Sequence, residues 1–152
     1  MSNERPIQRF TADKFTDFER EYNGGYGTAK HKAKFALALA RFVISGFDAA
    51  KFTPSLYNTL NGCFGHIAHY NRGGFYHTWF ADNEQRLSWL LYISTWRTYG
   101  DPKFTYTDVE AEFKDWLINS GIIEVYQKRV AAAQEASERA TLAALKAKYE
   151  EA

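Results

Sequence analysis

The sequence predicts an all-α fold, an irregular single-domain bundle of five to seven helices with a long C-terminal helix. Three observations predict it. Apolar residues recur at the three- and four-residue spacing of buried helical faces. Residues that cap helices precede several of these stretches. No glycine or proline follows Gly121, so one uninterrupted helix is favoured to the end of the chain.

Length and composition fit one globular domain. A chain of 152 residues can bury one sizeable core, and 45% hydrophobic residues exclude the composition of disordered chains. No apolar run reaches the ~18 residues of a membrane span, and the N-terminus lacks the apolar run of a secretory signal. We therefore expect no membrane partner and a cytoplasmic location, which agrees with a single cysteine, Cys63. We expect a flexible N-terminal arm at 1–10, a helical core domain at 11–130 and an Ala- and charge-rich helical extension at 131–152.

Turn residues separate three predicted helices in the first half of the chain. The first runs from Thr11 to Tyr22. Thr28 is the predicted N-cap of the second, and Gly46 ends it. A third helix is predicted at 55–70, with Pro54 suited to its first turn. The segment Asn71-Arg72-Gly73-Gly74 then predicts a turn.

Two capping boxes predict helices in the second half. The pairs Asp82–Gln85 and Thr107–Glu110 have the required three-residue spacing, and Gly121 ends the second of these helices. The long C-terminal helix follows it. We expect the two capped helices to pack together through a core formed by Leu87, Leu90, Leu91, Phe113, Trp116 and Leu117.

Three of the four histidines lie close together in the sequence. If 63–70 is helical, Cys63, His66 and His69 share a face, and His77 folds back toward them across the glycines. Imidazole and thiolate are zinc ligands, but the segment has no H-E-x-x-H, no C-x-x-C and no clear carboxylate partner. We therefore predict histidines packed in an aromatic core, no metal and no cofactor.

Arg72 stands on the predicted glycine turn beside aromatic residues. A guanidinium in that setting stacks on rings and binds a carboxylate or phosphate with two hydrogen bonds, or else caps the preceding helix. The candidate binding residues of this stretch are His66, His69, Arg72, Tyr76 and His77.

The start of the second helix is the candidate anion site. Lysines at a helix N-terminus oppose the positive end of the helix dipole, and an anion bound to the N–H groups there reverses that cost. The alternative is a set of exposed lysines beside a loop. The candidate residues are Gly25, Gly27, Thr28, Lys30, Lys32 and Lys34.

The C-terminal tail is rich in alanine and has few large side chains. Leu142, Leu145 and Tyr149 share one flank and are the candidate interaction residues. A helix of this kind either projects and frays or pairs with a partner or with its own copy, which makes a homodimer through this helix one of the expected assemblies.

No catalytic motif is present, and we assign no catalytic residue. The favoured prediction is a small non-enzymatic binding or regulatory protein that contacts another protein, with an accessory protein of a phage or mobile element as one such role. The alternative is an enzyme or ligand-binding domain that uses His66, His69, Arg72 and His77. Nucleic-acid or phosphate binding through Lys30, Lys32, Lys34 and Arg41 ranks third.

Overall fold

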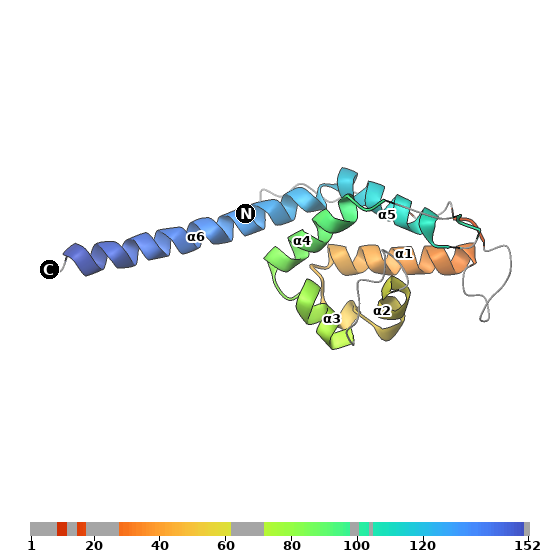
Figure 1. Cartoon of the computed structure of the whole chain (residues 1–152), viewed down its shortest axis with the longest axis horizontal. Coiled ribbons are helices and arrows are strands. Elements are labelled where there is room, and N and C mark those ends of the chain that lie inside the picture. The colour runs from red at the N-terminus through yellow and green to blue at the C-terminus, as the bar shows by residue number, and fades with distance from the viewer. Residues whose placement is uncertain are drawn as a thin grey trace.

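The computed structural model describes residues 9–11, 15–17, 28–61, 72–97, 101–103 and 105–150. These residues form six α-helices and one short 3-10 helix, with no strand among them (Figure 1). The all-α prediction with a long C-terminal helix is confirmed. The helices are α1 (Ala29–Ile44), η1 (Ala49–Lys51), α2 (Pro54–Asn61), α3 (Arg72–Trp79), α4 (Asn83–Ser94), α5 (Thr107–Ser120) and α6 (Ile122–Glu150).

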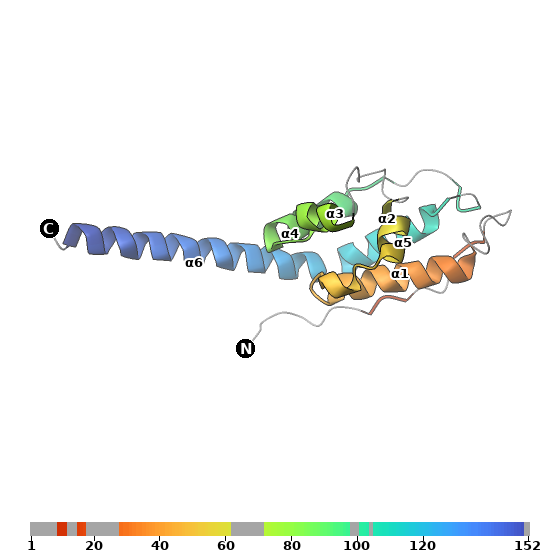
Figure 2. The same cartoon turned by 90° about the horizontal axis from the view of Figure 1, so that it is seen from below.

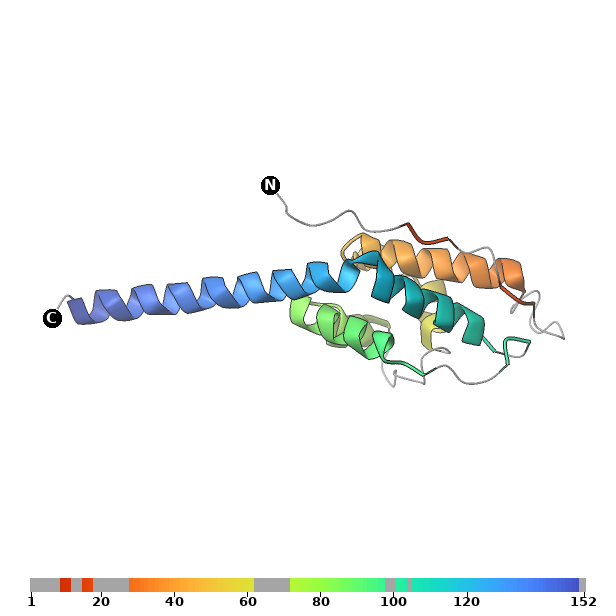
Figure 3. The same ribbon diagram turned by 90° about the horizontal axis from the view of Figure 1, so that it is seen from above.

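The bundle is built around α1, α4 and α5. Helix α1 contacts η1, α2 and α5, and α4 contacts α3, α5 and the beginning of α6. The rest of α6 leaves the bundle and extends far beyond it, so Glu150 lies at the end of a projecting helix (Figures 2 and 3). None of the described helices is long and apolar enough to cross a membrane.

Aromatic rings fill the centre of the core. Phe80, fully buried, lies 5.1 Å from the Phe42 ring, 5.2 Å from Phe47 and 5.2 Å from Trp89, measured between centroids. Such pairs contribute about 0.5–1.5 kcal/mol each beyond the apolar area that they bury. Phe47 has a left-handed backbone with φ 60°, which costs about 1–2 kcal/mol, and the full burial of its ring offsets that strain.

Several predicted helix ends are confirmed. The Thr28 hydroxyl accepts a hydrogen bond from the His31 N–H, and the Asp82 carboxylate accepts one from the Gln85 N–H, so both residues cap as expected. Gly121 adopts φ 91° directly after α5, a conformation that glycine reaches without the penalty of a Cβ atom.

The N-terminal prediction is wrong where the structure describes it. Residues 9–11 and 15–17 are not helical, and Phe10 is not part of a loose arm. Phe10 is buried, with its ring against those of Phe113 and Trp116, while the Thr16 N–H donates to the Asp108 carboxylate. Contacts with α5 outweigh the weak helical preference of this segment.

The N-termini of two further helices, α3 and α5, differ from the prediction. Arg72 and the glycines after it begin α3 instead of forming a turn, because that helix buries Phe75 completely. Thr107 is the first residue of α5 rather than its cap, and Glu110 accepts a hydrogen bond from the Trp96 indole instead of completing a capping box. The third helix is confirmed from Pro54 to Asn61, and 62–71 lies outside the described residues.

The predicted core between α4 and α5 is confirmed in most positions. Leu90, Phe113 and Leu117 are fully buried and Trp116 nearly so. The prediction is wrong for Leu91, which is 41% exposed, because the buried face of α4 is the one that carries Trp89, Leu90 and Ile93. Leu87 is only partly buried.

Candidate functional site

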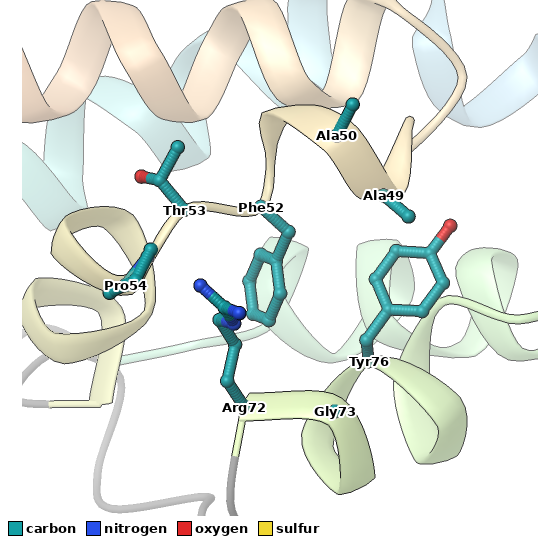
Figure 4. Close-up of a pocket in the computed structure, with 8 residues that line it drawn as sticks. All are labelled: Ala49, Ala50, Phe52, Thr53, Pro54, Arg72, Gly73 and Tyr76. Carbon is teal, nitrogen blue, oxygen red and sulfur yellow. The ribbon is translucent and has the colours of Figure 1, made fainter.

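A cavity of about 450 Å³ lies between η1, the start of α2 and the first turn of α3 (Figure 4). Phe52 and Tyr76 supply its aromatic walls, and Arg72 and Thr53 supply polar groups. The sequence brings these segments together because Phe52 and Phe75 are apolar and stack, with ring centroids 5.8 Å apart and an interplanar angle of 22°. The volume falls in the range of small-molecule sites.

Two of the predicted binding residues meet in this cavity. Arg72 and Tyr76 point from α3 toward η1 and the connector to α2 (Figure 4). The Tyr76 hydroxyl donates to the Phe47 carbonyl oxygen at 2.5 Å, which fixes the ring. His77 is exposed in the last turn of α3 and does not line the cavity. His66 and His69 lie outside the described residues.

At the predicted anion site, two N–H groups at the start of α1 already have partners within the chain, one of them acidic. The Ala29 N–H donates to the Asp17 carboxylate, and the His31 N–H donates to the Thr28 hydroxyl. Gly25 and Gly27 lie outside the described residues. The negative charge that the sequence suggested for this helix end therefore comes from the chain itself.

Lys32 differs from the other lysines with which it was grouped. Its side chain is 0% exposed, and its ammonium donates to Asp108 Oδ1 at 2.9 Å and to the Pro102 carbonyl oxygen at 2.8 Å. Lys30 and Lys34 are exposed. The sequence-based grouping is wrong for Lys32, because a charge buried in an internal ion pair does not reach a bound anion.

The ion pair belongs to a polar cluster between α1 and α5. The Tyr106 hydroxyl and His31 Nδ1 are 2.6 Å apart, and burial, followed by the charge of Lys34, lowers the pKa of His31. Glu110, on α5 beside this cluster, instead faces α4: burial raises its pKa, the hydrogen bond from the Trp96 indole opposes this rise, and the nearby Asp108 adds to it. With Lys32 fully covered, this cluster holds α1 on α5 rather than presenting charge to solvent.

The second half of α6 is the other candidate surface. Every residue from 131 to 150 is exposed, whereas Ile122, Val125 and Tyr126 at the start of the helix are buried. The three predicted interaction residues are large apolar side chains with exposed fractions of 58% for Leu142, 46% for Leu145 and 69% for Tyr149.

No family model, no curated protein and no solved structure matches this chain. Among the described residues, no group of three or more His, Cys, Asp and Glu side chains is placed to hold a metal ion.

Sequence reasoning missed half of the cavity and most of the polar cluster. Phe52 and Thr53 lie in an irregular connector, and no periodicity marks them. Asp17 and Asp108 read as ordinary exposed carboxylates, because nothing local indicates that they meet α1 across 12 and 76 positions of sequence. The arginine and aromatic residues after position 70 were the one sequence feature that predicted residues of the cavity, namely Arg72 and Tyr76.

Proposed function

We propose that this protein is a non-enzymatic binding protein that recruits another protein through the projecting half of α6. One observation carries the proposal: residues 131–150 form a continuous helix with every residue exposed and with three large apolar side chains on one flank. Twenty helical residues span about 30 Å. Apolar side chains held away from the core in this way are typical of protein interaction sites.

The exposed flank has the spacing of a coiled-coil seam. Glu135, Glu138, Leu142, Leu145 and Tyr149 follow one another in steps of three, four, three and four residues, so they occupy one face. The seam is acidic at one end and apolar at the other. It fits a partner helix with an apolar stripe and with basic side chains opposite the two glutamates.

The ion pair between Glu135 and Arg139 within α6 does not prevent a partner helix from binding at the seam. Arg139 Nη2 lies 2.8 Å from Glu135 Oε1, but the two side chains are 78% and 62% exposed. Exposed pairs of this kind contribute about 0.3–0.5 kcal/mol, so a partner's basic group exchanges with Arg139 at little cost.

A second copy of the chain fits the seam less well. In a parallel pair, Glu135 and Glu138 each face their own copies in the seam. In an antiparallel pair, the positions beside the seam on one side are Arg139 and Lys146, which are both positive. Reversing one copy therefore sets like charges opposite each other, and we assign the seam to a different protein.

The test is capture followed by direct binding. A partner retained from a lysate by the wild type is identified and purified, and its affinity is then measured against the wild type, the double variant Leu142→Ser/Leu145→Ser and the charge reversal Glu135→Lys/Glu138→Lys. Both variants should bind at least about tenfold more weakly. The matched control Ala136→Ser/Ala140→Ser changes the opposite face of the helix and should bind as the wild type does.

A truncation of the tail tests whether the fold depends on it, and two binding results would contradict the proposal. Removing residues 140–152 should leave the unfolding temperature nearly unchanged, because the described part of this segment, 140–150, buries nothing. Equal partner binding by the wild type and both seam variants overturns the proposal. A stable dimer in sedimentation that dissociates in the leucine variant assigns the seam to a second copy instead.

A further inference from the structure

The cavity between η1 and α3 is preformed and partly apolar. Phe52 is only 4% exposed, and its ring lies against Phe75 and, at 5.9 Å, against Tyr76. The Tyr76 hydroxyl is tied to the backbone at Phe47. Walls held in this way do not have to be ordered when a ligand enters, which favours binding.

The cavity carries positive charge and no acidic side chain. Arg72 is exposed and projects over the Phe52 side of the opening (Figure 4), and no described residue forms a salt bridge with it. None of the residues that line the cavity is Asp or Glu. A guanidinium at such a mouth binds a carboxylate or phosphate group through two parallel hydrogen bonds.

We propose that this cavity binds a small molecule with a flat aromatic body and one carboxylate or phosphate group. Arg72 receives the acidic group, while the Phe52 and Tyr76 rings contact the flat body. This site is independent of the α6 seam.

The acidic and aromatic parts of the ligand are tested with separate probes on the full chain. Isothermal titration with 1-naphthoate, 1-naphthyl phosphate, the neutral 1-naphthamide and inorganic phosphate measures each affinity. The two aromatic acids should bind at least about tenfold more tightly than the amide, which lacks the charge, and than inorganic phosphate, which lacks the ring. The tighter of the two acids distinguishes a carboxylate ligand from a phosphate ligand.

Variants then assign the site. Arg72→Gln should weaken the aromatic acids at least about tenfold and leave the amide unchanged, with Arg72→Lys in between. The exposed Arg97, after the end of α4, provides the matched control Arg97→Gln, which should bind as the wild type does. Circular dichroism checks that the variants fold. Failure of both aromatic acids to bind, equal affinity for acid and amide, or unchanged binding by Arg72→Gln overturns the proposal.

Discussion

Removing either member of the Lys32–Asp108 ion pair should destabilise the fold by unequal amounts. In Asp108→Asn the Lys32 ammonium, 0% exposed, loses the negative charge that faces it at 2.9 Å. The Pro102 carbonyl oxygen and the Tyr106 ring, whose centroid is 5.7 Å away, carry no net charge and do not replace it. Leaving a charge buried in this way costs about 3–5 kcal/mol. In a domain of this size that corresponds to a fall of about 6–20 °C in unfolding temperature.

The converse change, Lys32→Met, should be milder. Methionine has a similar length and no charge, and Asp108 is 14% exposed and still accepts the backbone N–H groups of Thr16 and Val109. We expect a cost of about 1–3 kcal/mol. The double variant should cost less than the sum of the two single changes, because the second change removes the charge that the first left without its partner.

Urea denaturation followed by tryptophan fluorescence and circular dichroism measures these differences. The exposed pair Glu135–Arg139 is the control: Arg139→Gln should change the free energy of unfolding by less than about 0.5 kcal/mol. A cost below about 1 kcal/mol for Asp108→Asn, or one no larger than that of Lys32→Met, would refute the assignment of a buried, fully committed lysine.

Two further predictions concern the α4–α5 interface. Burial raises the pKa of Glu110 above its ordinary value of 4.5, so the stability that its protonated form contributes is present below 4.5 and is lost as pH rises through the raised pKa. Glu110→Gln should therefore unfold at a higher temperature than the wild type at about pH 7 and at the same temperature in acid; a constant difference at all pH values would contradict this. Leu90→Ala should cost about 2–5 kcal/mol in denaturant unfolding, and Leu91→Ala, at a 41% exposed position, less than about 0.5. Equal costs would place the buried face of α4 elsewhere.

Local chemistry was enough to predict the helical class and many helix ends. Thr28 and Asp82 cap because their side chains reach an N–H three residues on, and Gly121 ends α5 because a left-handed residue is needed there. These interactions are complete within a few residues, so the sequence alone contains them. The exposed flank of α6 was also readable, since periodicity fixes which side chains share a face.

Tertiary structure decided what depends on distant partners. Lys32 reads as one of three similar lysines, and only the approach of Asp108 from α5 makes it a buried ion pair. The glycines of α3 favour a turn, yet burial of Phe75 against Phe52 makes that segment helical and closes the cavity that holds Arg72 and Tyr76. Local propensities differ by about 1 kcal/mol per residue, whereas burying one aromatic side chain contributes about 1.5–3 kcal/mol, so contacts between distant segments prevail where the two disagree.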